Sequence, residues 1–104
     1  MQVLDCATTP IFRGSGTTTA RPDVDIKIDA KTGFVIPEKS GLSLHLDQQK
    51  LIDRFGSALR VISIATELHI VQQGKDKGHY VISPNVPMTP VRFQELLDLT
   101  EFDS

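Results

Sequence analysis

The sequence predicts an α+β domain in which several short strands are combined with two main helices. Short apolar stretches, several of them alternating with polar residues, recur along the chain between glycine- and proline-containing turns. Two later stretches space their apolar residues at helical intervals, and each follows a residue that can cap a helix. A chain of 104 residues has room for one hydrophobic core. We therefore expect residues 1–104 to form a single domain.

The first 23 residues contain one clear strand signal. Residues 1–9 are expected to be a lead-in or an edge strand. Ile11 to Arg13 is a candidate strand that ends at Gly14-Ser15-Gly16. Residues 14–23 are rich in threonine and glycine and are expected to form an exposed loop.

Residues 23–40 contain two further apolar stretches. Residues 23–29 alternate, with Val24, Ile26 and Ile28 on one face, which predicts a strand or an extended segment that crosses the domain. Phe34-Val35-Ile36 is a short stretch that stops at Pro37. Residues 38–40 are expected to be a polar connector.

The middle of the chain predicts a strand followed by a helix. In the strand over residues 42–46, alternate side chains are leucines, so Ser43 and His45 share the opposite face. Asp47 is a suitable N-cap for a helix over residues 48–59. Gly56 weakens the last turn of that helix, which is therefore expected to be short.

The C-terminal part predicts strands, a turn and a last helix. Residues 61–65 and 68–72 are rich in β-branched side chains and predict one bent strand or two short ones. Gly74 to Gly78 predicts a hairpin-like turn into a strand over residues 79–83. Thr89 can cap the last helix, whose start is bracketed by prolines. Its outer side is expected to carry Glu95, Asp98, Glu101 and Asp103.

Charge and composition limit the possible partners. The chain holds 11 basic and 13 acidic residues, a net charge of −2, and no tryptophan, so a nucleic-acid-binding face is not expected. A local basic spot at Lys75 and Lys77, with Arg13, leaves RNA contact as a weaker alternative. The single cysteine, Cys6, excludes an internal disulfide. The first residues lack the pattern of a secretion signal, and no apolar run approaches the roughly 20 residues of a membrane span.

Arg13 is the first candidate site residue. It either pairs with Asp23 or Asp25 on the surface, or its guanidinium group holds a phosphate or carboxylate of a ligand. Gly14 would then allow ligand and backbone to approach closely.

Serine and histidine residues supply the other candidates. Ser43 lacks the sharp Gly-x-Ser-x-Gly turn of a hydrolase nucleophile and is expected to anchor a ligand or the backbone by a hydrogen bond. His45, on the same face, is either solvated or part of the site. His79 and Tyr80 point to opposite faces, so at most one of them faces a shared pocket. His69 is expected to be packed or exposed at an edge.

Metal ligation and paired-carboxylate chemistry find little support in the sequence. The three histidines are separated by 24 and 10 residues and match no short metal motif, so no metal is expected. Glu67 is the best-placed acidic candidate.

Several of these motifs together resemble a known family. Phe12-Arg13-Gly14, residues 33–37 and Gly41-Leu42-Ser43-Leu44 occur in an order that resembles the ADP-ribosyltransferase superfamily, whose members cradle NAD. Residues 79–84, followed by Pro87-Met88, look like the C-terminal part of small ADP-ribosyltransferase-like cytotoxic effectors of bacterial type VI secretion. The resemblance covers roughly residues 11 to 102 and implies a fold with two small facing β-sheets.

The resemblance also implies roles for individual residues. Arg13, with Gly14, would contact a phosphate or ribose of NAD, and Ser43 would help to hold the nicotinamide ribose. His45 is counted among the NAD-binding residues, and His79 or Tyr80 would line the cleft. Many members carry a glutamate on a late strand. In this chain either Glu67 takes that role, or histidine and tyrosine replace it.

The implied function is that of a bacterial toxin acting in the cytoplasm. It would transfer ADP-ribose from NAD to a macromolecular acceptor, or hydrolyse NAD. Its implied partner is a cognate immunity or antitoxin protein that covers the cleft. The alternative is a non-catalytic binding module of the same fold that acts through protein or RNA contacts.

Overall fold

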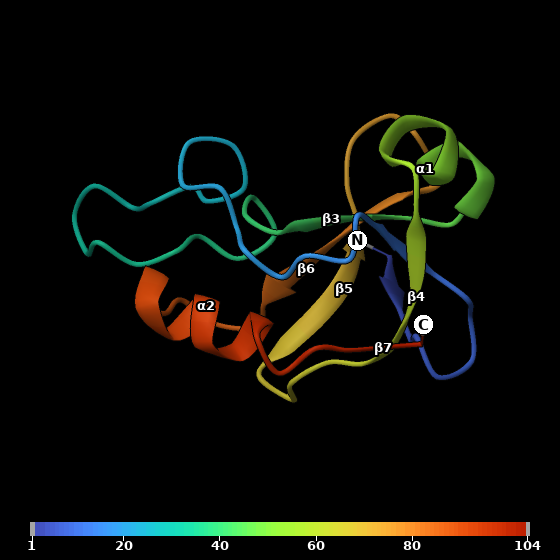
Figure 1. Cartoon of the computed structure of the whole chain (residues 1–104). Helices are drawn as coiled ribbons and strands as arrows, with labels where there is room; N and C mark the ends of the chain where they lie inside the picture. Colours follow the sequence, from blue (N-terminus) through green and yellow to red (C-terminus); the bar gives the residue numbers. More distant parts are fainter. Residues whose placement is uncertain (1, 104) are drawn as a thin grey trace.

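Seven strands and two helices make up residues 2–103, the part of the chain that the computed structural model describes (Figure 1). Met1 and Ser104 lie outside the described residues. The helices are α1 (Gln48–Phe55) and α2 (Pro90–Leu97). The strands are β1 (Val3–Leu4), β2 (Phe12–Gly14), β3 (Leu42–His45), β4 (Ala58–Ser63), β5 (Leu68–Gln72), β6 (His79–Pro84) and β7 (Glu101–Asp103). The predicted α+β class with two main helices is therefore confirmed.

The strand order places the strands that carry the candidate site residues, β2, β3 and β6, next to one another. All described pairs are antiparallel, and the order across the sheet is β1-β5-β6-β3-β2-β4-β7. Strand β3 therefore lies between β6 and β2. His45 of β3 is paired with Phe12 of β2 on one side and with His79 of β6 on the other. The strands that carry Arg13, Ser43 with His45, and His79 are distant in sequence but are thus neighbours in one sheet.

This sheet differs from the expected one. The described strands form one connected sheet of seven strands instead of two small facing sheets. The reason is that β3 pairs on both of its edges and so joins the β1-β5-β6 group to the β2-β4-β7 group. Sequence patterns predict strands but not which strands share hydrogen bonds.

Local signals place several elements as predicted. The Asp47 side chain accepts a hydrogen bond from Lys50 N at 3.1 Å, and Thr89 Oγ1 accepts one from Arg92 N at 3.1 Å, so both predicted caps are confirmed. The turn at residues 74–78 joins β5 to β6 as an antiparallel hairpin. The stretch at 1–9 contains the edge strand β1. Of the two alternatives for residues 61–65 and 68–72, two separate strands are observed, β4 and β5.

Both helices end earlier in the chain than the sequence predicted. Helix α1 stops at Phe55 because Gly56 adopts a left-handed conformation (φ 85°). Leu59 therefore belongs to β4 and not to a helix. The expectation that Glu101 and Asp103 decorate the last helix is wrong, since they form β7, which covers the edge of β4.

Residues 23–29 are a loop and not a strand. Val24 and Ile28 are 57% and 44% exposed, whereas Asp25 is buried. The Asp25 carboxylate accepts a hydrogen bond from Arg21 N at 2.8 Å. An isolated bridge from Ile28 to Val35, and another from Val35 to Met88, tie this loop to the start of α2. The alternation therefore does not mark a strand here, because residues 22–25 form a turn and Ile28 makes an isolated bridge.

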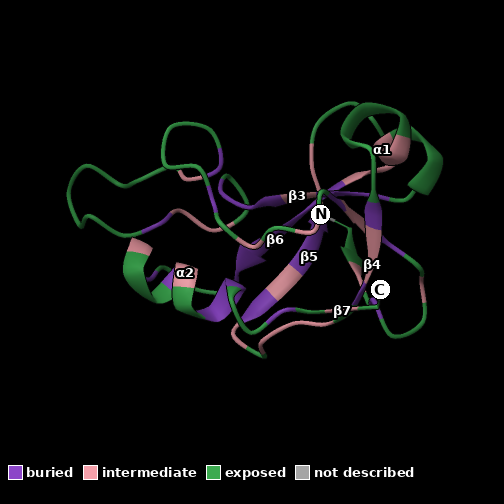
Figure 2. Ribbon diagram, viewed as in Figure 1, coloured by how far each residue is buried: buried purple, intermediate pink, exposed green. Residues whose placement is uncertain are grey.

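The hydrophobic core lies on the side of the sheet that α2 covers (Figure 2). Phe93, Leu96 and Leu97 of α2 are buried with sheet residues such as Leu42 and Ile82. Helix α1, in contrast, has no buried residue, although it packs on β2 and β4. Its apolar side chains are therefore available to line a pocket. Within the described residues, neither helix is long enough or apolar enough to cross a bilayer.

Candidate functional site

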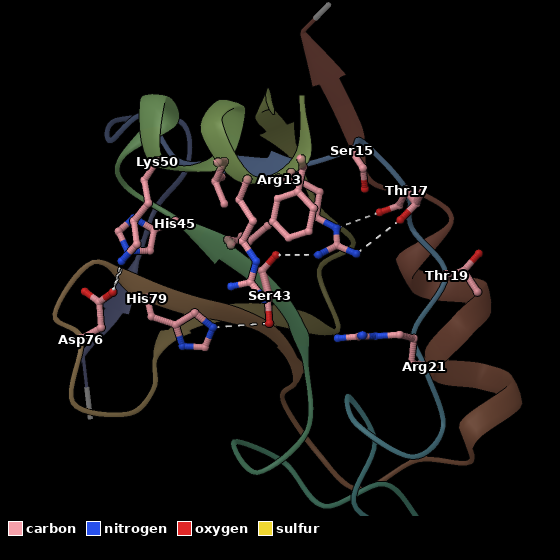
Figure 3. Close-up of a pocket in the computed structure, with 15 residues that line it drawn as sticks. Arg13, Ser15, Thr17, Thr19, Arg21, Ser43, His45, Lys50, Asp76 and His79 are labelled. Carbon is pink, nitrogen blue, oxygen red and sulfur yellow. Dashed lines mark hydrogen bonds and ion pairs between the residues drawn. The ribbon is translucent and has the colours of Figure 1, made fainter. Parts of the chain in front are cut away.

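A cavity of about 530 Å³ opens beside α1 (Figure 3). Its walls come from the end of β2 and the loop after it, from β3, from α1, and from the β5–β6 hairpin with the start of β6. A cavity of this size falls within the range for small-molecule sites. Five sequence-predicted residues line it: Arg13, Gly14, Ser43, His45 and His79.

Arg13 brings a partly buried positive charge into this cavity. Its Nε donates to Thr17 O at 3.0 Å, Nη1 donates to Ser43 O at 3.0 Å, and Nη2 donates to Thr17 Oγ1 at 3.3 Å. Among the described residues, no carboxylate oxygen lies within 4.0 Å of its guanidinium group. Burial lowers the pKa of Arg13 from its usual value, and the charge of Asp25 offsets only part of this.

Of the two alternatives for Arg13, the surface ion pair with Asp23 or Asp25 is therefore not observed. Asp25 lies instead near Arg21, with 3.6 Å between Oδ2 and Nε. The Arg13 guanidinium is left with neutral oxygen acceptors only. A desolvated cation of this kind is stabilised by an incoming anion.

The other charged residues of the lining are also mainly basic. Arg21, Lys50 and Arg54 accompany Arg13, and Asp76 is the acidic lining residue within the described part of the chain. Lys50 Nζ lies 2.9 Å from Asp76 Oδ2, so this pair is neutralised. The remaining charge favours an anionic ligand.

An exposed aromatic ring forms one wall. Phe55, at the end of α1, lines the cavity and is 47% exposed. The Arg54 guanidinium lies 5.2 Å from the centroid of this ring. Gly14 is required next to it, because a Cβ atom at position 14 would overlap the Phe55 side chain. The ring is therefore held at the wall between β2 and Arg54, and 47% of the residue remains exposed.

Ser43 and His79 face each other across β3 and β6. His79 Nδ1 lies 3.1 Å from Gln73 O, and because a carbonyl only accepts, Nδ1 carries the proton. Nε2 then presents a lone pair, and Ser43 Oγ lies 3.4 Å from it (Figure 3). The arrangement places a hydroxyl next to an imidazole ring that a backbone carbonyl holds in place.

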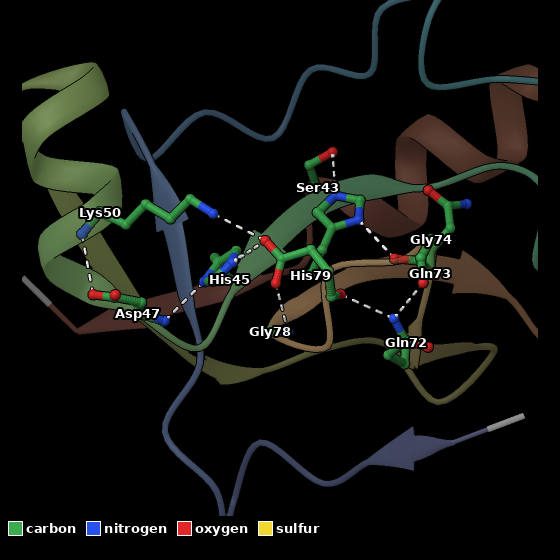
Figure 4. A network of polar contacts seen from close by, with 10 residues as sticks. Ser43, His45, Asp47, Lys50, Gln72, Gln73, Gly74, Gly78 and His79 are labelled. Carbon is green, nitrogen blue, oxygen red and sulfur yellow. Dashed lines mark hydrogen bonds and ion pairs between the residues drawn. The ribbon is translucent and has the colours of Figure 1, made fainter.

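His45 is buried and is the centre of a polar network (Figure 4). Its Nδ1 accepts a hydrogen bond from Asp47 N at 2.9 Å, so Nε2 is the protonated nitrogen that donates to Asp76 Oδ2, also at 2.9 Å. Asp76 further accepts from Lys50 Nζ and from Gly78 N, each at 2.9 Å. Hydrogen bonds from His45, Lys50 and Gly78 hold the pKa of Asp76 well below its usual range.

This network settles the open alternatives for His45. The side chain is not solvated, and both ring nitrogens are engaged by protein groups. It joins β3, α1 and the β5–β6 hairpin at one end of the cavity. His45 therefore shapes the wall of the site through contacts with the protein.

Two predicted site residues lie elsewhere. Tyr80 is 3% exposed and belongs to the hydrophobic core, on the strand face opposite to His79. Glu67 lies in the turn before β5, where its carboxylate is 2.9 Å from Arg92 Nη2 of α2. Neither residue lines the cavity, so the expected late acidic group is not brought to the site.

Several lining residues were missed by sequence reasoning. Thr17 lies in a loop with no chemical motif, and Phe55 and Lys50 belong to the amphipathic helix, where the pattern indicated core packing and a solvated face. Asp76 lies in the predicted turn between Lys75 and Lys77 and lines the cavity. The two lysines, which the sequence indicated as a local basic spot, are not among the lining residues. One feature of the sequence could have indicated Asp76 as a lining residue. It is the acidic residue in the predicted hairpin turn, two positions before Gly78-His79.

Comparison of the chain with protein-family models, curated proteins and solved structures finds no match. Among the described residues, no group of three His, Cys, Asp or Glu side chains could hold a metal ion. The case for a function therefore rests on the geometry of the cavity.

Proposed function

We propose that the chain is an NAD-consuming bacterial toxin of the ADP-ribosyltransferase type, which transfers ADP-ribose to an acceptor or hydrolyses NAD. The observation that carries this proposal is the partly buried Arg13, which has no carboxylate partner and lies beside Ser43, His79 and an exposed Phe55 ring. NAD combines a pyrophosphate, ribose hydroxyls and flat rings. The cavity offers a cation, hydrogen-bonding groups and an aromatic wall.

Each part of the cavity has a role in this proposal. Arg13, with Arg54 nearby, binds the pyrophosphate, because a guanidinium fork matches phosphate oxygens. The Ser43 hydroxyl holds a ribose hydroxyl, and the Phe55 ring stacks on a base or nicotinamide ring. NAD supplies an activated carbon, the C1′ of its nicotinamide ribose, from which nicotinamide can leave. Holding this carbon beside an acceptor provides the rate gain of proximity.

Glu67 and Tyr80 have no part in this version of the site. Glu67 is paired with Arg92 and Tyr80 is in the core, so the polar group of the late strand is His79. The proposal keeps the bacterial cytoplasm as the place of action and an immunity or antitoxin protein as the partner that closes the cavity. A partner that places a carboxylate on Arg13 would satisfy the unpaired charge.

The first experiment compares the wild-type chain with Arg13→Ala. We expect the wild-type chain to arrest growth when it is expressed in bacteria, with a fall in NAD, and to bind NAD in calorimetry when purified. Arg13→Ala should do neither while it retains a cooperative unfolding transition. A wild-type chain that neither binds nor consumes NAD would contradict the proposal.

A non-catalytic binding module is the second candidate. It is favoured by one observation: Asp76, the acidic group of the cavity, is bound by three donors and is not free to stabilise positive charge on a reacting ribose. This candidate predicts that any growth arrest occurs with NAD unchanged. It also predicts that arrest survives Arg13→Ala.

A further inference from the structure

His79 differs from the other groups of the cavity that could accept a proton. The described lining contains two imidazoles and one carboxylate, namely His45, His79 and Asp76. Both nitrogens of His45 are engaged, and the Asp76 carboxylate receives three hydrogen bonds. His79 Nε2 meets only Ser43 Oγ, at 3.4 Å.

The orientation of His79 is fixed by the hairpin that carries it. Its Nδ1–H donates to Gln73 O at 3.1 Å, and its backbone N donates to Asp76 O at 3.0 Å. These contacts direct the Nε2 lone pair toward the cavity (Figure 3). The Ser43 hydroxyl shows that an O–H group can be accommodated next to this lone pair. A distance of 3.4 Å is long for a hydrogen bond, as is common for catalytic pairs without substrate.

We infer that His79 is the general base of the site and that the acceptor is an O–H group, either water or an alcohol. This inference rests on the proposed use of NAD. In the step, the acceptor oxygen forms a bond to C1′ of the nicotinamide ribose and its proton moves to His79 Nε2. The C1′–N bond breaks, and its electron pair stays on the nicotinamide nitrogen. The imidazolium then returns its proton to solvent.

The chemistry of the lining selects this acceptor class. A carboxylate acceptor carries no proton and would not need a neutral imidazole. A guanidinium acceptor would enter a cavity that already contains Arg13, Arg21 and Arg54, where like charges repel it. A neutral O–H group avoids this repulsion and gains from a base that removes its proton.

The test uses the purified chain with NAD and measures the products by mass spectrometry. Three reactions contain water alone, added methanol as an alcohol probe, or added agmatine as a guanidinium probe. We expect free ADP-ribose in water, or methyl ADP-ribose when methanol is present, and no agmatine adduct. The ratio of the first two products distinguishes water from alcohols as the acceptor. An agmatine adduct as the main product would overturn the inference.

Variants of His79 test its role as the base. We expect His79→Ala to bind NAD in calorimetry but to release nicotinamide about 10²–10⁴-fold more slowly. Added imidazole should restore part of the rate to His79→Ala and none to Arg13→Ala. The control is His69→Ala, which changes a histidine outside the cavity and should retain the wild-type rate.

The outcomes separate this inference from the proposed function. NAD turnover by the wild-type chain that is unchanged in His79→Ala, or a slow His79→Ala that imidazole does not restore, overturns the inference alone. The absence of both NAD binding and turnover in the wild-type chain overturns the proposed function and the inference together. If His79→Ala does not fold, the agmatine reaction of the wild-type chain still decides on the acceptor class, and His79→Gln replaces the alanine variant.

Discussion

The Arg13 guanidinium group is held by oxygen atoms that carry no full charge. Two carbonyl groups and one hydroxyl group accept its hydrogen bonds, and burial lowers its pKa. A group whose pKa is lowered by burial makes the folded state less stable while it is charged. The folded chain therefore bears a cost at this residue that a bound anion would relieve.

This cost leads to a prediction about anions. We expect inorganic pyrophosphate to raise the melting temperature of the wild-type chain, with a gain of about 2.7 kcal/mol at a concentration 100 times its Kd. Arg13→Ala should lose the gain, and Arg13→Lys should retain only part of it because an ammonium group cannot form the fork. Thermal unfolding with and without pyrophosphate measures the effect. An equal shift in wild type and Arg13→Ala would contradict an anion site at Arg13.

Asp76 gives a prediction about pH. Its folded-state pKa is lowered, so its contribution to stability is present above the ordinary carboxyl pKa of about 3.9 and is lost progressively as the pH falls below it. Asp76→Asn should therefore be less stable than wild type at pH 7, and the difference should shrink between about pH 4 and pH 2. Urea denaturation at several pH values measures this. Asp23→Asn, at an exposed site in a loop, is the control and should change stability little at any of these pH values.

At the scale of single residues, the sequence indicated part of the site. Arg13, Gly14, Ser43 and His79 were predicted from chemical type and strand position, and they line the cavity. The sequence placed Asp76 in the predicted hairpin turn, but its contact with His45, 31 positions earlier, could not be predicted, because it depends on the pairing of β3 with β6. Glu67 looked suitable in sequence only because its ion pair with a residue of α2 is not visible there.

At the scale of elements, local signals were sufficient where one residue decides a boundary. Asp47 and Thr89 cap the helices, and Gly56 ends α1. The boundary between α2 and β7 was not predictable in this way. Residues 101–103 continue the helix pattern, but pairing with β4 outweighs their local preference.

Helix α1 allows a prediction about binding that is separate from stability. Phe55→Ala should weaken NAD binding about tenfold or more, since stacking of a ring on an aromatic side chain is worth about 1–3 kcal/mol. Folding stability should change little because the side chain is 47% exposed. Val91→Ala on α2, outside the cavity and 73% exposed, is the matched control and should change neither. Calorimetry with NAD and urea denaturation together make the comparison.

At the scale of the whole molecule, the strand order determines the site. The sequence indicated the strand regions at 11–13, 42–46 and 79–83, but not that β3 lies between β6 and β2. That order depends on contacts between distant segments, for which local patterns carry no signal. It is also the reason why seven strands form one sheet and not two.

The core under this sheet depends on α2. Phe93 is fully buried, so Phe93→Ala should reduce the free energy of unfolding by about 3–5 kcal/mol, a large part of the 5–15 kcal/mol typical of a domain. In urea denaturation, the midpoint of Phe93→Ala should lie at a lower urea concentration than that of the wild-type chain. The folded population at 37 °C should also be smaller. A loss below about 1 kcal/mol would show that α2 is not packed as described.

A single oxygen atom, Asp76 Oδ2, accepts hydrogen bonds from both His45 and Lys50. Substitutions at these two positions are therefore expected to be epistatic. Once one donor is removed, the other no longer shares Asp76 Oδ2. The loss of folding free energy caused by a substitution at one of the two positions therefore depends on which residue is present at the other. This coupling restricts how the wall of the cavity can evolve. Substitutions of Lys50 on α1 and of His45 on β3 are expected to occur together, or to follow a substitution at position 76.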